Sequence, residues 1–362
     1  MAVTLTDVAI KTRKSIRWGI YFIIFILVAR FAISSGRSIK NTFFPAPPPP
    51  PTVGFDVLPA IQFPQYSQAL PQLSVSVETP TGTLPEFPES LPVYFMPKAL
   101  PTLNSVDVAK SRARNLGFKS DPIEISQTVY RFDHPTDPSS LTMNIVWETF
   151  SIAYDLASDP SPIQKNPPHP EAAVNQVNTL LRNANSLPAD LTGPTPHEFL
   201  KVESQKLVQA ISLSEADLIK VNLYRKNFGS EDNPIPVVTK DPNEANVWFI
   251  ISGTGQIIAG EFHYYPIDEE KVHTYPIKTA AQALEDLKAG RAYIASLGLN
   301  QDGAVIVRDI YLAYYDPDIN SEFFQPVIVF KGDDNFLAYV PAVTDQYYEV
   351  PAPPTKEPQP TQ

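Results

Sequence analysis

Residues 279–290 read Thr-Ala-Ala-Gln-Ala-Leu-Glu-Asp-Leu-Lys-Ala-Gly, and they begin the most regular part of the chain. Thr279 and Gln282 have the spacing of a capping box, in which each side chain bonds the backbone of the other at a helix start. Alanine and leucine recur on one helical face, and Gly290 is a typical C-terminal stop. The stretch therefore predicts a short amphipathic helix.

Strands follow this helix directly. Alternation of apolar and polar residues predicts three of them, at residues 304–314, 327–331 and 336–343. The last two turn at Gly332-Asp333-Asp334-Asn335, a run of turn-forming residues. This part of the chain predicts a helix packed on a sheet.

An earlier part of the chain repeats this order. Residues 104–117 predict a helix that Gly117 closes, and Asn104 or Ser105 can cap it. Alternation then predicts a strand at 128–132 and a long half-buried strand at 141–156. Because helix and strands recur at 104–156 and 279–343, we expect an internal duplication.

The remaining segments predict further elements of both kinds. Residues 171–185 place apolar side chains on one helical face, and Thr195-Pro196-His197-Glu198 has the pattern of another helix start. Residues 52–101 carry prolines every few positions and predict an irregular edge meander, with short β-like pieces at 73–78 and 93–96. Strands are predicted at 218–224, 247–252 and 256–265, the last two joined by the hairpin turn Gly253-Thr254-Gly255.

Composition limits the classes of function. The chain has 362 residues, 43% of them hydrophobic, which is sufficient for buried cores. Without cysteine it has no disulfide, thiol nucleophile or thiolate metal site. Residues 1–40 hold seven Lys or Arg and one Asp, so of the total charge of −11 the remainder carries −17. Such an acidic body disfavours binding to nucleic acid.

The first forty residues predict a membrane anchor. Residues 18–33 are almost continuously apolar, and a span of about 20 residues fits 16–36 if Arg30 extends its side chain to the interface. Basic residues on the N-terminal side favour a cytoplasmic N-terminus. A cleaved secretory signal is the alternative, and both interpretations export the rest of the chain. The proline run within 37–52 predicts a stiff polyproline II stalk.

One part of the sequence is similar to a known family. The matching residues are Tyr275-Pro276-Ile277, Thr279, Ala283, Leu284 and Leu287, then Val305, Val307, Asp309 and Leu312-Ala313-Tyr314-Tyr315, then Gln325-Pro326-Val327, Phe330-Lys331-Gly332, Phe336 and Ala338-Tyr339-Val340-Pro341-Ala342. This pattern resembles the C-terminal domain of the YycH/YycI regulators, over about 70 residues. Those are membrane-anchored extracytoplasmic accessories of a cell-wall-sensing histidine kinase, with PepSY-like domains. The resemblance implies peptide binding or regulation and supplies no catalytic residues. The proline-rich stalk departs from the family.

Two groups of residues offer alternatives that involve metals. His263 and His273 flank Asp268-Glu269-Glu270, but neither spacing matches a recognised ligand pattern. Residues 316–322 place oxygen ligands at alternate positions as calcium loops do, yet Ser321 replaces the required glycine and Val327 the terminal glutamate. Solvated histidines and a polar strand connection are the simpler interpretations. We therefore expect no catalytic residue, cofactor or bound metal.

Aromatic residues near the C-terminus form the candidate partner-binding face. Its members are Tyr311, Tyr314, Tyr315, Phe323 and Phe324. Alternation along the strand puts Tyr311 and Tyr315 on one face and Tyr314 on the other. Such tyrosines suit contact with a peptide or glycan. The alternative is a layer packed under the helix of the same unit.

Together these features predict an α+β protein with two PepSY-like units, each an antiparallel sheet with helices on one face, behind a transmembrane helix. The expected parts are a cytoplasmic tail (1–15), the span (16–36), the stalk (37–52), a first unit (53–158), a second unit (159–350, with a PepSY-like core at 275–343) and a disordered tail (351–362). We expect a membrane-anchored extracytoplasmic binding or regulatory protein that contacts the bilayer through 16–36 and acts through a protein or peptide. The alternatives are an envelope hydrolase or metal-dependent enzyme that uses His263 and His273, and a passive structural surface protein.

Overall fold

The computed structural model describes residues 18–19, 22–27, 30, 50–66 and 70–349. The chain divides into two units, Met1–Pro50 and Pro51–Gln362. In the first unit the described residues 18–19, 22–27 and 30 are helical. No helix within the described ranges is both long and apolar enough to cross a membrane. Predicted parts that lie mainly or wholly outside the described residues are the tail 1–15, the span 16–36, the stalk 37–52 and the tail 351–362.

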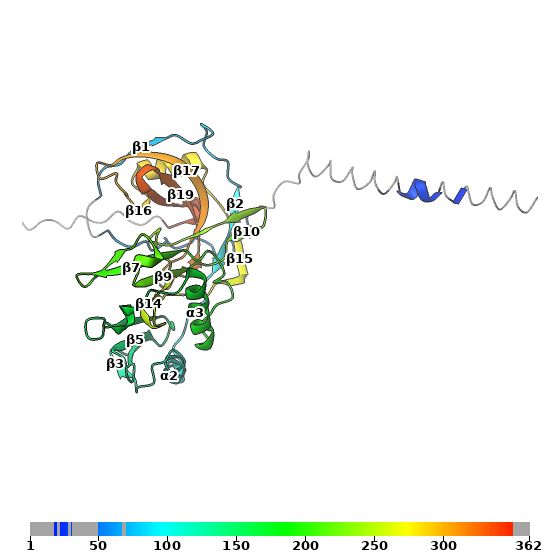
Figure 1. The fold of residues 1–362 in the computed structure, drawn as a ribbon. Helices are drawn as coiled ribbons and strands as arrows, with labels where there is room; N and C mark the ends of the chain where they lie inside the picture. Colours follow the sequence, from blue (N-terminus) through cyan, green and yellow to red (C-terminus); the bar gives the residue numbers. More distant parts are fainter. Residues whose placement is uncertain (1–17, 20–21, 28–29, 31–49, 67–69, 350–362) are drawn as a thin grey trace, which may run out of the picture. The chain divides into compact units, whose positions relative to one another are not determined.

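The second unit is α+β, as the sequence predicted (Figure 1). Its helices are α2 (Ser105–Asn115), α3 (Pro170–Asn183) and α4 (Ala280–Lys288), with short 3-10 turns at η1 (Ser161–Gln164), η2 (Leu213–Glu215), η3 (Asp333–Asn335) and η4 (Asp345–Tyr347). A helix followed by strands therefore occurs three times in this unit, once more than the sequence indicated.

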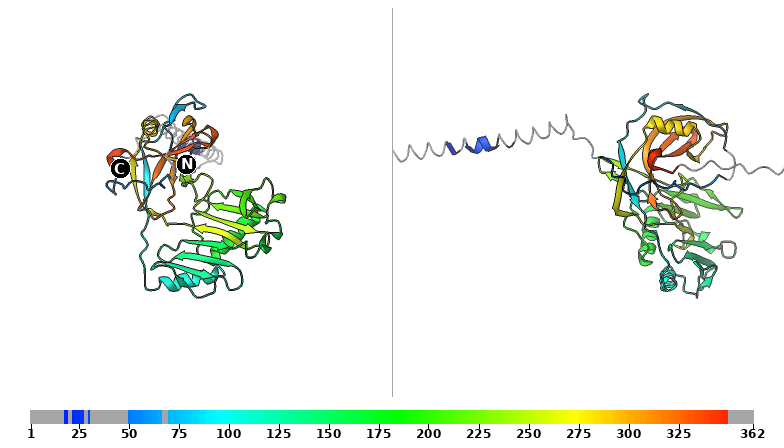
Figure 2. Two further views of the ribbon diagram at one scale, coloured as in Figure 1. Left: turned by 90° about the vertical axis from the view of Figure 1, so that its left-hand side faces the viewer. Right: turned by 180° about the vertical axis from the view of Figure 1, so that it is seen from behind.

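A nine-stranded antiparallel sheet forms the middle of the chain, and Figure 2 (left) shows it as a continuous series from teal to yellow-green strands. In spatial order it contains β3 (Ile123–Glu124), β4 (Val129–Asp133), β5 (Ser139–Asn144), β6 (Phe150–Tyr154), β14 (Ile257–Phe262), β13 (Val247–Ser252), β9 (Leu218–Leu223), β7 (His197–Glu203) and β8 (Lys206–Gln209). Helices α2 and α3 bury small apolar residues against one face of this sheet, namely Ala109, Ala113, Ala173, Val177 and Leu181.

A six-stranded sheet carries the C-terminal part of the chain. It contains β1 (Ser74–Val77), β17 (Ala304–Tyr315), β19 (Pro326–Gly332), β20 (Leu337–Pro341) and β16 (Tyr293–Ser296) in that order, and β12 (Val237–Val238) pairs with the end of β17. Both β1 and β12 run parallel to β17, so the prediction of purely antiparallel sheets is wrong here. These strands come from distant parts of the sequence, and no hairpin turn fixes their direction.

Helix α4 covers one face of the six-stranded sheet (Figure 2, right). The predicted capping box is confirmed, because the Thr279 hydroxyl accepts a bond from the Gln282 backbone N–H and the Gln282 side chain accepts one from that of Thr279. Gly290 ends the helix with φ of +74°, a conformation that favours glycine. The apolar face of α4 then packs on the sheet through Ala280, Ala283, Leu284 and Leu287.

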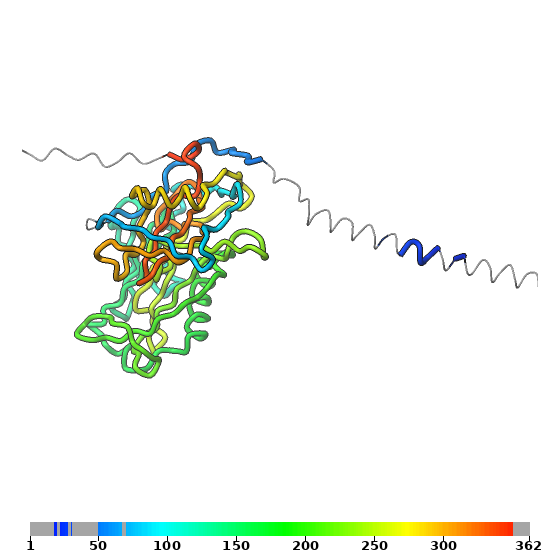
Figure 3. Tube along the Cα trace, turned by 90° about the horizontal axis from the view of Figure 1, so that it is seen from above, coloured from blue at the N-terminus to red at the C-terminus, as the bar shows by residue number. Residues whose placement is uncertain are grey.

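Two small sheets complete the unit. One contains β15 (Asp268–Pro276), β2 (Ser90–Phe95) and β18 (Phe323–Phe324), and the other is the hairpin of β10 (Phe228–Ser230) with β11 (Asn233–Ile235). Strand β2 lies between its two partners, so this part of the predicted edge meander is an interior strand. The backbone of Tyr348 pairs with that of Leu58, and Figure 3 shows the two ends of the described unit, in red and blue, side by side.

The predicted strand at 141–156 is instead the β5–β6 hairpin. The Asn144 side chain accepts bonds from the backbone N–H groups of Val146 and Trp147, and Glu148 takes φ of +59°. Asparagine side chains stabilise turns in this way. The buried apolar residues change from odd positions before the turn to even positions after it, and the prediction of one continuous strand did not take account of this shift.

The predicted helix start at Thr195-Pro196-His197-Glu198 is also wrong, because His197–Glu203 forms β7. The carbonyls of Pro194 and Pro196 accept bonds from the backbone N–H groups of Tyr224 and Asn222, which places this segment beside β9. Pairing with the sheet thus overrides the local capping pattern.

The nine-stranded sheet contains strands from both sides of residue 158, where the sequence analysis divided the two units. The sheets therefore divide the chain differently from the ranges 53–158 and 159–350. The nine-stranded sheet spans residues 123–262. Apart from β12, the strands of the six-stranded and three-stranded sheets come from before and after this range.

A buried ion network joins these two regions. The Arg225 side chain has no exposed surface, and its Nη1 lies 2.6 Å from Asp190 Oδ2. Its Nε lies 3.0 Å from Asp316 Oδ1, an ion pair without hydrogen-bond alignment. Its Nη2 donates to the Tyr265 carbonyl, and the guanidinium lies 4.2 Å from the centre of the Tyr264 ring. Arg225 follows β9 and Asp316 follows β17, so this network connects the two large sheets.

Burial, only partly offset by the positive charge of Arg225, raises the pKa of Asp316 above its usual range, and Asp190 adds to the increase. Two carboxylates share one cation here, and neither has full access to water. A carboxyl whose pKa is higher in the folded state than in the unfolded state stabilises the folded state when it is protonated. Its contribution to stability is complete below the unfolded pKa and is lost as the pH rises through the folded pKa.

We expect Arg225→Met to lower the free energy of unfolding by about 3–5 kcal/mol, because it leaves Asp190 and Asp316 buried without their cation. Lys226→Met is the matched control, since Lys226 pairs with Glu269 at the surface and its loss should cost under about 1 kcal/mol. Urea unfolding of both variants measures the difference. Equal losses would contradict a structural role for the buried network.

We also expect Asp316→Asn to become more stable relative to the parent chain as the pH rises from about 4 to about 7. The asparagine keeps the shape of the side chain but never ionises. Urea unfolding of both proteins across this range gives the difference in unfolding free energy. If the stability of Asp316→Asn relative to the parent stays constant or falls as the pH rises, ionisation of Asp316 does not destabilise the fold.

Candidate functional site

The structure buries most of the predicted aromatic face. Tyr314 and Phe324 stack with ring centres 5.0 Å apart and are 1% and 0% exposed. Tyr315 and Phe323 are buried as well. The predicted alternation is confirmed, since Tyr314 belongs to the core under α4 and Tyr315 to the core on the opposite face. Only Tyr311 remains partly accessible, so four of these five residues serve packing.

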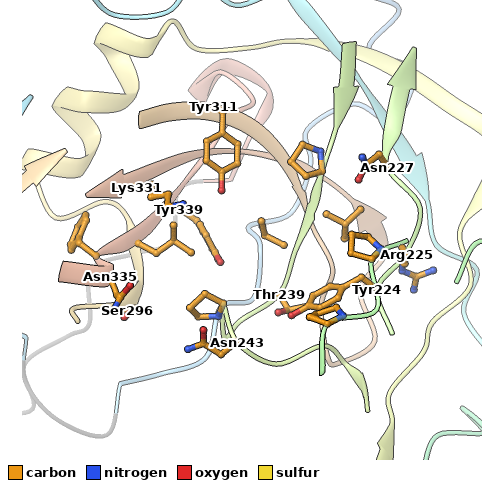
Figure 4. A pocket seen from close by; sticks show the side chains of 18 residues that line it. Tyr224, Arg225, Asn227, Thr239, Asn243, Ser296, Tyr311, Lys331, Asn335 and Tyr339 are labelled. Carbon is orange, nitrogen blue, oxygen red and sulfur yellow. The ribbon is translucent and has the colours of Figure 1, made fainter. Parts of the chain in front are cut away.

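Tyr311 lies in a cleft of about 440 Å³ on the face of the six-stranded sheet opposite α4 (Figure 4). This volume falls within the usual range of ligand sites, about 300–1,000 Å³. The sheet side is lined by Ser296, Tyr311, Lys331, Asn335, Phe336, Leu337 and Tyr339, and the other side by Pro194, Pro196, Tyr224, Arg225, Asn227, Pro236, Val237, Val238, Thr239, Pro242 and Asn243. The second set comes from the end of β9, the loop before β7 and the segment around β12. The cleft therefore lies where the two large sheets meet.

Phenol groups dominate the polar chemistry of the cleft. Figure 4 shows Tyr311 and Tyr339 extending from the sheet toward the side that holds Tyr224 and Thr239. Burial raises the pKa of Tyr224 to about 12 and raises that of Tyr311 and Tyr339 as well. All three hydroxyls therefore remain protonated at neutral pH and can donate hydrogen bonds.

The hydroxyl of Tyr339 is buried and has no hydrogen-bond partner among the described residues. The hydroxyl of Tyr315 is also buried without a hydrogen-bond partner among the described residues, but Tyr315 does not line the cleft. An unpaired buried hydroxyl costs about 1–3 kcal/mol. A ligand that accepted a bond from Tyr339 would recover part of that cost.

The cleft differs in charge from the rest of the protein. Its described lining includes Arg225 and Lys331 but neither aspartate nor glutamate, although the chain carries a net charge of −11. Asp190 and Asp316 neutralise Arg225. Lys331 is exposed and forms no ion pair within the described part of the chain. The cleft therefore suits a neutral or acidic ligand.

A segment of the chain itself occupies the adjoining part of the same sheet face. The Phe63 ring stacks on Tyr293 with centres 4.8 Å apart and planes 2° apart, and its edge meets Tyr315. Tyr66 stacks on the same Tyr293 ring at 5.6 Å. Residues 59–66 have neither helix nor strand pairing. The tyrosine-rich face thus already packs against a segment of the chain, which a bond from the Phe63 N–H to the Ile61 carbonyl bends.

The two histidines of the enzyme alternative have separate surroundings. His263 pairs with Glu261 at 3.1 Å, whereas the His273 ring contacts Thr52 and Phe55. No cluster of three or more His, Asp or Glu side chains suited to a metal occurs in the described ranges. The structure brings neither histidine to the cleft.

The oxygen ligands of the calcium alternative are engaged by cations of the protein. Asp316 pairs with Arg225, Asp318 with Lys240 and Glu322 with Lys98. These pairs separate the carboxylates instead of directing them to one centre. The segment 316–322 is therefore a strand connection held by ion pairs.

Sequence reasoning missed most of the cleft. Tyr339 belongs to a predicted strand, and alternation along that strand would have placed it on the same face as Leu337. Tyr224 and the segment around β12 carry no local signal, because β12 is two residues long and pairs with β17 some 77 positions later.

No protein family matches the chain, and no curated protein matches its sequence. Among solved structures, an uncharacterized protein from Eubacterium rectale is 11% identical, with 73% of this chain and 85% of that chain covered at a TM-score of 0.37. The C-terminal domain of YpeB from Bacillus megaterium is 12% identical, with 68% of this chain and 95% of that domain covered at a TM-score of 0.31. At these values the two structures resemble this chain only in part and assign it to no family.

Proposed function

We propose that this chain is a non-enzymatic binding or regulatory protein of the cell envelope that holds a protein or peptide partner in the cleft. The observation that carries the proposal is the lining of the cleft: accessible Tyr311, the unpartnered hydroxyl of Tyr339 and the unpaired Lys331, with no acidic side chain among the described lining residues. Tyrosine combines a large apolar ring with a hydrogen-bond donor, and it is enriched at binding sites for that reason.

The lining contains no nucleophile paired with a base. Its hydroxyls come from tyrosine, Thr239 and Ser296, and no histidine accompanies them. Thr239 donates its hydroxyl proton to the carbonyls of Asp241 and Glu244, which fixes a turn. Recognition of a ligand accounts for this lining better than hydrolysis does.

The proposal includes a location. Residues 16–36 form a transmembrane helix with the N-terminus in the cytoplasm, and residues 37–52 form a stalk that carries the rest outside. The apolar run at 18–33 and the basic residues before it support this arrangement. The resemblance to the YycH/YycI regulators supports two PepSY-like units and contact with an envelope sensor or peptidase.

Protease added to intact cells should digest the region between residues 53 and 350. The bilayer should protect residues before the stalk. Immunoblotting for tags at each end measures both fragments, and lysed cells serve as the control. An intact product recovered in the soluble fraction of the cytoplasm would contradict the proposed location.

A photo-crosslinking residue in place of Asn243, on the cleft rim, should capture an envelope protein or peptide in intact cells. The same residue in place of Asn183, an exposed position at the end of α3 outside the cleft, is the matched control. Mass spectrometry of the adducts measures the difference. Equal adducts at both positions, or hydrolysis of a wall polymer or peptide by the purified chain without any captured partner, would contradict the proposal.

A further inference from the structure

Two phenols and one ammonium group lie together on the sheet side of the cleft. Tyr311 and Tyr339 are opposite the same residue, Val329, on the two strands that flank β19. Lys331 follows Val329 by two positions, so it projects from the same face and is a diagonal neighbour of both tyrosines. Such neighbours lie about 7–8 Å apart, within reach of a long side chain. Figure 4 shows Lys331 beside Tyr339. One ligand group can therefore accept hydrogen bonds from the ammonium and a phenol at once.

Two of these donors have no acceptor among the described residues. Tyr339 is 0% exposed, yet its hydroxyl bonds no other group of the described chain. The exposed ammonium of Lys331 forms no ion pair in the same ranges. Asp309 lies opposite Lys331 in the strand register, but it does not line the cleft. A bound acceptor would satisfy both donors, and a buried hydroxyl gains most from such a partner.

The carboxylates near the other side of the cleft are engaged by groups of the protein. Glu244 pairs with Lys220, and Asp318 pairs with Lys240. Asp241 accepts a hydrogen bond from the backbone N–H two positions later. Because these acids already have partners, they leave the ammonium of the cleft available to a ligand.

A single free ammonium beside phenols suits a carboxylate. The two oxygens of a carboxylate accept several hydrogen bonds, and bonds to a charged acceptor are stronger than neutral ones. A phosphate group carries nearly two charges at neutral pH and is typically held by arginine forks or by a helix N-terminus. Two carboxylates already bind Arg225, and no α-helix begins within the described lining segments. The lining therefore matches a carboxylate better than a phosphate.

We propose that the ligand of the cleft carries a carboxylate, which Lys331 and Tyr339 bind together. This inference rests on the function proposed above and names the group that the same site recognises. The free C-terminus of a peptide and the side chain of an aspartate or glutamate both supply this group. A neighbouring ring of the ligand packs on the aromatic lining, as Phe63 and Tyr66 pack on the adjoining Tyr293.

Titration of the full chain with short synthetic peptides tests the proposal, and saturation-transfer NMR measures binding. The first pair is acetyl-alanyl-tyrosyl-alanine with a free C-terminal carboxylate and its C-terminal amide. The second pair, both amidated, is acetyl-alanyl-glutamyl-tyrosyl-alanine and its glutamine counterpart. At least one acid should bind about tenfold more tightly than its neutral counterpart, because its hydrogen bonds have a charged acceptor. The pair that shows this preference identifies the source of the carboxylate.

Substitution of exposed lysines tests the ammonium. Lys331→Gln should weaken binding of the preferred acid about tenfold and leave binding of its neutral counterpart unchanged. Lys206→Gln on β8 is the matched control, since Lys206 is also an exposed strand lysine without an ion pair in the described ranges and lies outside the cleft. Neither substitution should change the urea concentration at which the chain unfolds.

Two conservative variants test the phenol. Tyr339→Phe should weaken binding of the acid about fivefold, because it removes one of the two donors. Tyr315→Phe removes an equally unpartnered buried hydroxyl outside the cleft and should leave binding unchanged. Both variants should unfold at the same or higher urea concentration than the parent, so a loss of binding is not a loss of fold.

The outcomes separate this proposal from the preceding one. Equal binding of the acids and their neutral counterparts, or no detectable binding of either acid, would overturn the carboxylate as the recognised group. Acid binding that survives Lys331→Gln, or that falls equally with Tyr339→Phe and Tyr315→Phe, would overturn the assigned donors. In each of these cases a partner crosslinked at Asn243 would still support the proposed function. The absence of any crosslinked partner would contradict that function and leave a measured preference for the carboxylate intact.

Discussion

Arg225 is the side chain on which the arrangement of the two large sheets depends. It is fully buried and holds Asp190, from the loop after α3, and Asp316, from the end of β17. Moving a charged group out of water is expensive, so these three residues stabilise the fold only while they remain together. Gly193 belongs to the same junction, because a Cβ there would lie 1.9 Å from the carbonyl oxygen of Arg225. The junction therefore requires both a specific ion network and a glycine.

The cleft is a consequence of this junction. Tyr224 and Arg225 directly follow β9 of one sheet, and β12 pairs with β17 of the other. The Asp316 backbone N–H donates to the Val238 carbonyl beside it. One wall of the cleft thus comes from the main strands of the six-stranded sheet, and the other from β12 and the segments that flank β7 and β9. A ligand in the cleft contacts both regions, so its binding is coupled to the way they pack.

The sequence predicted elements well where local signals were strong. The capping box at Thr279 and the glycine stop at Gly290 gave the position of α4, and alternation gave β17, β19 and β20. It failed where local and long-range signals disagree. The capping pattern at Thr195 yields to pairing with β9, and the turn after Asn144 separates two alternating runs that differ in phase by one residue. Local chemistry sets a preference of about 1 kcal/mol, which a row of strand bonds readily exceeds.

By itself the sequence determined the α+β class, the bounds of α4 set by its capping box and glycine, the acidic character and the absence of cysteine chemistry. These properties depend on composition and on residues within a few positions of one another. The tertiary structure alone decided that β1 and β12 run parallel to β17, that Tyr314 and Phe324 are core residues and that Tyr311 and Tyr339 line a cleft. Each of these outcomes joins residues that are tens to hundreds of positions apart. Their pairing follows from the packing of whole sheets, which no local pattern encodes.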